Sequence, residues 1–161
     1  DVTPHHIALW DSNYKVNPPI REKEDVDALV DAIIDGTVDA IGTDHAPHSK
    51  EDKEKGSPGM VGLDTAFPIS YTSLVKSGKI NLMRLSSLLS SRPGEILSLN
   101  KGKIEKGFDG DLVLVDLEEK YKIDPDKFAS KSKNTPFKEM EVYGSIKYTI
   151  IGGQIRYQRE A

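Results

Sequence analysis

The stretch "VDAIGTDHAPH", residues 38–48, ends a short apolar run with a group of polar residues. An apolar run followed by Gly-Thr-Asp is typical of a buried parallel strand that delivers a polar side chain at its carboxyl end. Asp44 in that position has two interpretations. It can bind a metal ion through one oxygen and accept a proton with the other, or it can cap a helix or turn. Its position leaves both open, and capping is the commoner use.

The segments around this stretch predict an α/β arrangement. Apolar residues at helical spacing predict a helix over 25–35, and Gly36 follows where a helix stop is expected. Two more helical segments fit residues 62–78 and 81–99, and we expect Pro93 to separate two helices in the second. Helix, strand, loop and helix in this order are typical of the last part of an α/β barrel.

From residue 100 the pattern changes to β structure. Residues 111–117 are strand-like, and residues 141–160 predict two strands that are joined across Gly152 and Gly153. The segment between these regions is polar and turn-rich, so we expect an ordered loop there.

Composition excludes several classes of function. With 161 residues, of which 37% are hydrophobic, the chain can bury one core. Its formal net charge is −4, and its lysines alternate with acids, so we expect neither a nucleic-acid nor a membrane partner. The absence of cysteine favours the cytoplasm and leaves histidine and carboxylate as the metal ligands. The chain has no initial methionine, and we expect it to be a fragment.

The four histidines lie in two short loops, "TPHH" and "DHAPH". His45 and His48 do not flank a glutamate on a helix, and Pro47 favours a loop, so the zinc-protease pattern is absent. A histidine beside a capping aspartate is more often structural than catalytic. His5 and His6 are adjacent, so they point in different directions and rarely bind the same metal ion.

The stretch "KVNPPIR" is stiff and extended because of its two prolines. It could hold the amide of Asn17 and the guanidinium of Arg21 toward a carboxylate. The alternative is a surface turn, which is the commoner structure for such a sequence.

Taken together and in order, "TPHH", "KVNPPIR", "TDHAPH", "PGMVGLDT" and "SKSKNTPF" resemble the C-terminal half of a dihydroorotase. The dihydroorotases concerned are those close to hydantoinases and allantoinases in the amidohydrolase superfamily. The resemblance implies an α/β fold, with the C-terminal part of a TIM-like (β/α)8 barrel over residues 1–99. It implies part of a small β-sandwich, with its connecting loop, over residues 100–161.

The same resemblance implies a role for five residues. Asp44 matches an aspartate that binds the more buried metal ion and shuttles a proton to the ring nitrogen, so it is the expected catalytic and metal-binding residue. Asn17 and His48 match residues that hold the free carboxylate of dihydroorotate. Pro58 and Gly59 match a backbone segment that contacts the pyrimidine ring.

The implied reaction is the reversible, zinc-dependent interconversion of N-carbamoyl-L-aspartate and L-dihydroorotate in pyrimidine biosynthesis, with two zinc ions in the full-length protein. His5 and His6 match no family metal ligand, so we interpret them as support for the site. The other ligands lie upstream of Asp1 in the family. We therefore expect the chain alone to be inactive and to need the upstream half of its protein.

Two alternatives stay open. One is a cyclic amidase of the hydantoinase or allantoinase type, against which the expected carboxylate contacts at Asn17 and His48 argue. The other is an inactive dihydroorotase-like scaffold for aspartate transcarbamoylase, and a homo-oligomer is a further expected partner. The loop over residues 48–59 is highly charged and contains glycine, so we expect mobility that substrate suppresses.

Overall fold

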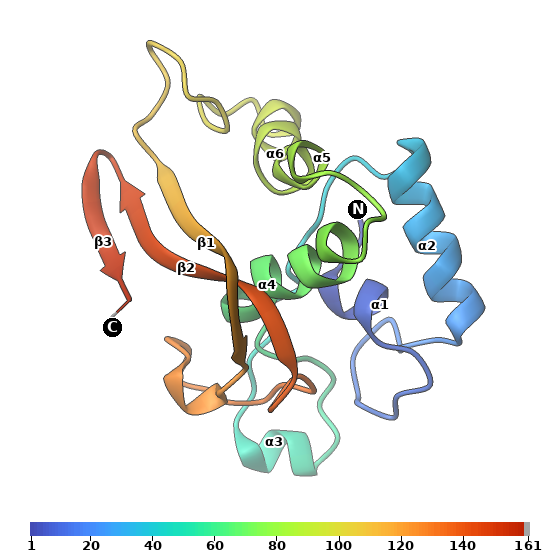
Figure 1. Cartoon of the computed structure of the whole chain (residues 1–161). Helices are drawn as coiled ribbons and strands as arrows, with labels where there is room; N and C mark the ends of the chain where they lie inside the picture. The colour runs from blue at the N-terminus through green and yellow to red at the C-terminus, as the bar shows by residue number, and fades with distance from the viewer. Residues whose placement is uncertain (160–161) are drawn as a thin grey trace.

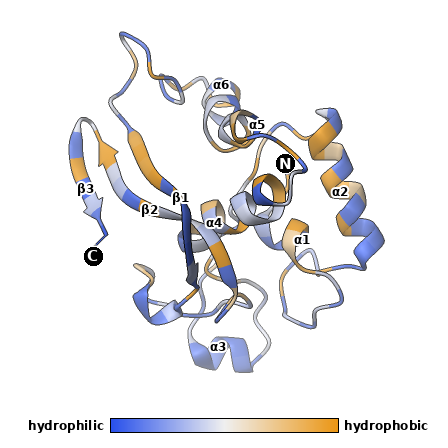
Figure 2. Ribbon diagram, in the orientation of Figure 1, coloured by the Kyte–Doolittle hydropathy of each residue, from blue (hydrophilic) through white to orange (hydrophobic). Residues whose placement is uncertain are grey.

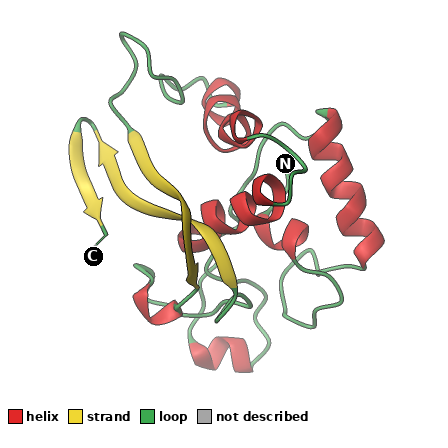
Figure 3. Cartoon of the chain, in the orientation of Figure 1, coloured by secondary structure: helices red, strands yellow, loops and turns green. Residues whose placement is uncertain are grey.

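The computed structural model describes residues 1–159, so the last two residues of the expected β-rich region lie outside the described residues. Helices fill one side of the molecule and an antiparallel sheet lies on the other, with α4 in contact with both (Figure 1). Figure 3 shows the same division by secondary structure. Among residues 1–159, no helix is both long and apolar enough to cross a membrane.

The helical elements are short apart from α2. The α-helices are α1 Pro4–Ala8, α2 Lys23–Asp35, α3 Lys50–Glu54, α4 Ala66–Ser70, α5 Leu82–Ser86 and α6 Arg92–Ile96. The 3₁₀ turns are η1 Leu63–Thr65 and η4 Pro125–Lys127, and the π-helical turns are η2 Tyr71–Lys76 and η3 Ser87–Ser91. The strands are β1 Leu112–Lys122, β2 Glu141–Ile151 and β3 Gln154–Gln158.

The helix expected over 25–35 is confirmed as α2. A capping box closes its first turn, because the Glu22 side chain accepts the N–H of Asp25 and the Asp25 side chain accepts the N–H of Glu22. Gly36 ends the helix in the left-handed conformation, with φ of +93°. The face that the apolar spacing predicts is the buried one, with Val26, Val30 and Ile33 inside.

The strand expected over 38–44 is present as an extended segment with parallel pairing at single positions. Val2 pairs with Ile41, and the Gly42 N–H donates to the Val2 carbonyl at 2.9 Å. His45 pairs in parallel with Met60. A parallel ladder needs paired residues along both strands. Val2 and Met60 each provide one paired position, so no longer strand forms.

Pro93 does not separate two helices, contrary to expectation. Residues 82–96 form one continuous helical run, in which the π-helical turn η3 joins α5 to α6. In η3 the Arg92 N–H donates to the Ser87 carbonyl, one residue further back than in an α-helix. The next bond in that register would need an N–H at residue 93, which proline lacks. The Leu88 carbonyl accepts the Ile41 N–H instead, at 2.9 Å.

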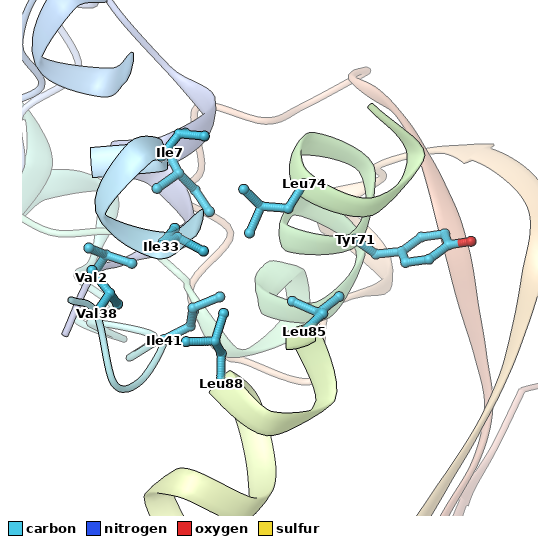
Figure 4. Packing of buried hydrophobic residues seen from close by; sticks show 10 residues of the cluster. Val2, Ile7, Ile33, Val38, Ile41, Tyr71, Leu74, Leu85 and Leu88 are labelled. Carbon is cyan, nitrogen blue, oxygen red and sulfur yellow. The ribbon is translucent and has the colours of Figure 1, made fainter. Parts of the chain in front are cut away.

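The helices and the extended segments share one apolar core (Figure 4). Leu74 and Leu88 are completely buried in it, and Figure 4 shows Tyr71 pointing from its helix toward the strands. The buried members are Val2, Ile7, Val30, Ile33, Val38, Ile41, Tyr71, Leu74, Leu85 and Leu88. A second cluster joins segments from both ends of the chain, and its members are Ala8, Val16, Ile20, Met60, Ile69, Ile123, Phe137 and Val142.

The sheet has the strand order β1-β2-β3, with antiparallel neighbours. The hairpin expected across Gly152 and Gly153 is confirmed, and both glycines have positive φ, as a tight hairpin turn requires. Gly144 lets β2 approach α4, because a Cβ there would lie 2.8 Å from the Phe67 ring. Several apolar residues of the sheet are exposed, and Figure 2 colours the hydrophobic strand segments orange.

We expect Arg84→Met to lower the free energy of unfolding by about 1.5–3 kcal/mol, the value of hydrogen bonds to a charged group. Arg84 Nη2 donates to the carbonyls of Ile33 and Val38, so it ties α5 to the end of α2. Arg92→Met is the matched control, because its ion pairs with Asp39 and Glu95 are exposed and worth less than about 1 kcal/mol. Denaturant unfolding measures both. Equal losses would contradict a specific role for Arg84.

Candidate active site

Asp44 lies where the extended segment ends, with a left-handed backbone of φ +47°. Its side chain is 41% exposed. Ser49 rather than Asp44 caps the next helix, α3, by accepting the Asp52 N–H. Within residues 1–159 no backbone N–H donates to the Asp44 carboxylate, so the capping interpretation is wrong. The carboxylate is left free for a ligand.

His5 is the ionisable neighbour of that carboxylate. Its Nε2 lies 3.8 Å from Oδ2 of Asp44, and its side chain is 1% exposed. Burial, together with a smaller effect of the adjacent His6, lowers the pKa of His5 to about 4. His5 is therefore neutral near pH 7. Asp44 faces a dipole rather than a second full charge.

The hydrogen bonds of His6 and Thr3 fix the orientation of that dipole. His6 Nε2 lies 3.0 Å from the Pro18 carbonyl, which accepts only, so this nitrogen donates. In neutral His6 the Nδ1 atom then accepts the Thr3 hydroxyl proton over 2.7 Å. The Thr3 oxygen is left to accept from His5 Nε2 at 3.1 Å. His5 therefore carries its proton on the nitrogen that faces Asp44. His5 and His6 lie in α1 rather than in a loop, contrary to expectation, and their supporting role stays a prediction.

Asn17 is exposed in a segment that is fixed at both ends. The Pro18 carbonyl is held by His6, and the Lys15 carbonyl accepts the Gly59 N–H at 3.0 Å. Arg21 does not join Asn17, because its guanidinium pairs with Asp25 at 3.5 Å on the surface of α2. The amide of Asn17 is therefore the group that this segment presents.

His48 is half-buried and its backbone is held by a distant segment. Its carbonyl accepts the Ser132 hydroxyl at 2.7 Å and also the Asn134 side-chain amide. The Asn134 carbonyl in turn accepts the Val61 N–H at 2.8 Å. The "SKSKNTPF" segment therefore holds the backbone of the loop that carries His48. The sequence did not predict that Ser132 and Asn134 bind the His48 carbonyl. The signal available was their side chains, which can donate hydrogen bonds to a loop backbone.

Gly59 packs directly under His48. Its φ is +130°, and a Cβ would lie 3.1 Å from Cδ2 of the His48 ring and 2.6 Å from the Ala46 carbonyl oxygen. Pro58, just before it, is exposed. Close packing thus fixes the position of the His48 ring relative to the 58–59 segment.

His45 has a structural role. Its Nδ1 accepts the N–H groups of Gly62 and Leu63, at 3.1 and 3.2 Å, so a neutral His45 carries its proton on Nε2. The residue lines an open hollow of about 310 Å³ with Leu63, Asp64, Ala129 and Ser130. The interpretation of this histidine as structural agrees with these contacts.

The five expected site residues are linked through named contacts. Asp44 lies beside His5, which is linked through Thr3 and His6 to the Pro18 carbonyl, next to Asn17. In the same segment the Lys15 carbonyl accepts the Gly59 N–H, and Gly59 packs against the His48 ring. The described residues supply less of a metal site. In the part of the chain that the structure describes, no three histidine or acidic side chains gather as a metal-binding group. Asp44 fits as one ligand, because its carboxylate is exposed and uncommitted.

Comparison with known proteins identifies a family. The model of the amidohydrolase family matches residues 11–156. A dihydroorotase of Clostridium botulinum (strain Eklund 17B / Type B) is 55% identical over 99% of this chain, and one of Bacillus cereus (strain AH820) is 44% identical over 100%. The chain spans 40% of the length of each of these relatives.

Solved structures show the same relationship. The L-hydantoinase (dihydropyrimidinase) of Arthrobacter aurescens matches 99% of this chain with a TM-score of 0.92 and 30% identity, over 39% of its own length. The D-hydantoinase of Bacillus sp. AR9 matches 97% with a TM-score of 0.90 and 26% identity, over 38% of its length. The expected fold class, an α/β chain forming the C-terminal part of an amidohydrolase barrel with a small antiparallel sheet, is confirmed.

We expect Gly59→Ala to cost about 1–3 kcal/mol more unfolding free energy than Gly78→Ala. Both glycines have positive φ, +130° at Gly59 and +77° at Gly78, so both alanines carry backbone strain of about 1–3 kcal/mol. A Cβ at Gly78 meets nothing within 4 Å, whereas one at Gly59 clashes with the Ala46 backbone and the His48 ring. Denaturant unfolding of the two variants gives the comparison. Equal costs would show that the packing under His48 is loose.

Proposed function

This chain belongs to the amidohydrolase family, and we propose that it is the C-terminal part of a dihydroorotase. Such an enzyme is a cyclic amide hydrolase that interconverts N-carbamoyl-L-aspartate and L-dihydroorotate in pyrimidine biosynthesis. The identity to curated dihydroorotases over nearly the whole chain supports the proposal. The structural observation that carries it is the free carboxylate of Asp44 at the end of its extended segment.

Asp44 is the proton carrier in this proposal. In ring opening it accepts a proton from the attacking water and returns it to the ring nitrogen as the amide bond breaks. In ring closure the same carboxylate takes the proton from the attacking nitrogen and gives it to the carboxyl oxygen, which leaves as water when the C–O bond breaks. The Nε2 atom of His5, 3.8 Å from Oδ2 of Asp44, is the nearest ionisable neighbour of this proton carrier.

Zinc is the proposed cofactor of the complete protein, with two ions. When bound, zinc polarises a substrate carbonyl and increases the acidity of water. Asp44 is the residue of this chain that would hold it. His5 does not fit as a ligand through Nε2, because that nitrogen carries a proton shared with Thr3. The remaining ligands are proposed to lie upstream.

Asn17 and His48 are the proposed partners of the substrate carboxylate. An amide and an imidazole can both donate to a carboxylate, and holding that group orients the ring for proton transfer. Pro58 and Gly59 form the proposed ring-contacting backbone. The Gly59 N–H already donates to Lys15 and its carbonyl accepts from Lys53, so the Pro58 carbonyl is the group this segment offers to the ring.

The proposed organisation assigns residues 1–99 to the barrel and residues 100–161 to the β-sandwich. The proposed main partner of this chain is the upstream half of the same cytoplasmic protein. Large exposed apolar side chains on the sheet support this, because contact with the upstream half would remove them from water. They include Val113, Leu114, Ile151, Ile155 and Tyr157.

A hydantoinase-like cyclic amidase is the second candidate, and the similarity to solved hydantoinases favours it. The two candidates differ in the substrate: dihydroorotate carries a free carboxylate and simple hydantoins do not. An inactive scaffold for aspartate transcarbamoylase would turn over neither substrate.

We expect Asp44→Asn to reduce dihydroorotate ring opening by the zinc-loaded complete protein by at least about 100-fold, because a positioned acid–base group contributes that much or more. Asparagine keeps the size of the side chain but cannot accept and return the proton. Asp39→Asn is the control, since Asp39 lies on the same segment and makes a surface ion pair with Arg92. Full activity in the Asp44 variant would remove Asp44 from the mechanism.

We expect Asn17→Ala to raise the KM for dihydroorotate by about tenfold or more, the effect of losing a hydrogen bond to a charged group. Turnover of an uncharged hydantoin, where it is detectable, should stay within about twofold because no carboxylate bond is lost. Steady-state kinetics with both substrates makes the comparison. A parallel fall for both substrates would contradict carboxylate recognition, and preference of the unsubstituted protein for the hydantoin would favour the second candidate.

A further inference from the structure

Lys53 differs from the other residues of α3. The remaining residues of this short helix are exposed, whereas Lys53 is half-buried. Its ammonium donates to three backbone carbonyls, those of Lys15 at 3.0 Å, Ser57 at 2.9 Å and Gly59 at 2.8 Å. An ammonium group has three N–H donors, so all of them are used. Its long flexible stem is thus held in one place.

The three carbonyls come from two segments that face the proposed substrate. Lys15 lies two residues before Asn17, and Ser57 and Gly59 flank Pro58. The same Lys15 carbonyl also accepts the Gly59 N–H at 3.0 Å. Lys53 therefore lies at the junction of the segment that presents the Asn17 amide and the segment that presents the Pro58 carbonyl.

The ammonium of Lys53 also contacts an aromatic ring. Its nitrogen lies 4.6 Å from the centre of the Tyr14 ring, at the distance of a cation–π contact. Partial burial lowers the pKa of Lys53, and the nearby charge of Lys15 acts in the same direction. Three carbonyls and the ring face replace part of the lost hydration, and an uncharged side chain would bind these groups less strongly.

We infer that Lys53 is a positioning residue, whose ammonium joins the 15–17 segment to the 57–59 segment and so fixes the spacing between Asn17 and Pro58. The inference rests on the proposed function for its consequence in catalysis. Lys53 does not reach the substrate itself, because its three donors are occupied by backbone carbonyls. It acts through the two segments. Its loss weakens binding of the carboxylate-bearing substrate more than it slows proton transfer at Asp44.

The mobility expected for residues 48–59 stays a prediction, and Lys53 specifies what must break for this loop to move. Opening of the loop separates the ammonium from Lys15, since Lys53, Ser57 and Gly59 belong to the loop and Lys15 does not. A substrate that contacts both segments would favour the joined state.

The test compares Lys53→Met with Lys50→Met in the complete protein. Methionine keeps an unbranched apolar stem and removes the charge, and Lys50 is an exposed lysine of the same helix, 4.0 Å from Glu54. We expect Lys53→Met to raise amide hydrogen exchange at Gly59 by about tenfold or more, because hydrogen bonds to a charged group are lost. We expect a similar rise in the KM for dihydroorotate, with kcat within about threefold. Lys50→Met should change neither quantity.

Chemical rescue separates the ammonium from general packing. Lys53→Cys should behave like Lys53→Met, and alkylation with 2-bromoethylamine, which restores an ammonium on a stem of similar length, should lower both the exchange at Gly59 and the KM. The unsubstituted protein, treated in the same way, is the control for other reactive groups. A variant that unfolds globally would show faster exchange in the core around Leu74 and Leu88 as well, and the rescue then decides.

Three results would overturn the inference: equal exchange at Gly59 in the Lys53 and Lys50 variants, faster exchange with an unchanged KM, or a kcat loss that exceeds the KM rise. Failure of the proposed function looks different. In that case the unsubstituted protein does not open dihydroorotate, while the exchange comparison at Gly59 still decides whether Lys53 holds the two segments together.

Discussion

The hydrogen bond from the Ile41 N–H to the Leu88 carbonyl joins the extended segment that carries Asp44 to the helical run 82–96. It exists because proline at position 93 cannot supply the next donor of the π-helical turn, which leaves that carbonyl without a helical partner. The bond fixes the extended segment against the helical run 82–96. Val2 holds the other edge of the same segment, and Asp44 therefore leaves it from a fixed position.

Beyond this segment the site wall is made of loops, and side chains rather than ladders satisfy its backbone. His6 donates to Pro18, Ser132 donates to His48, and Lys53 donates to three carbonyls. Carbonyls without strand partners are satisfied by such donors or by water, and a bond to a side chain also fixes the position of the backbone. The same contacts that satisfy the backbone thereby determine where Asn17, His48 and Pro58 lie.

Periodic apolar patterns predicted α2 and the β2–β3 hairpin, because burial of one face and glycine at a turn are local properties. Pro93 was misjudged because its effect depends on an acceptor that is used by a distant residue, Ile41. The position of Asp44 left a cap and a ligand as open interpretations, and the structure shows that Ser49 caps the next helix. The contact of Ser132 with His48 and that of Lys53 with Lys15 join residues that are far apart in sequence and lie in or beside irregular loops. No periodic pattern predicts such contacts.

The backbone at Asp44 explains why this residue type stands there. The extended segment pairs with Val2 through Ile41 and with Met60 through His45, so the chain changes neighbours between these positions. A left-handed residue interrupts the strand geometry, and aspartate and asparagine adopt that conformation at lower cost than most side chains. Asparagine would satisfy the backbone equally well. The left-handed backbone therefore accounts for a small polar residue at this position but not for a carboxylate in particular. The proton transfer proposed for Asp44 supplies a reason for the carboxylate.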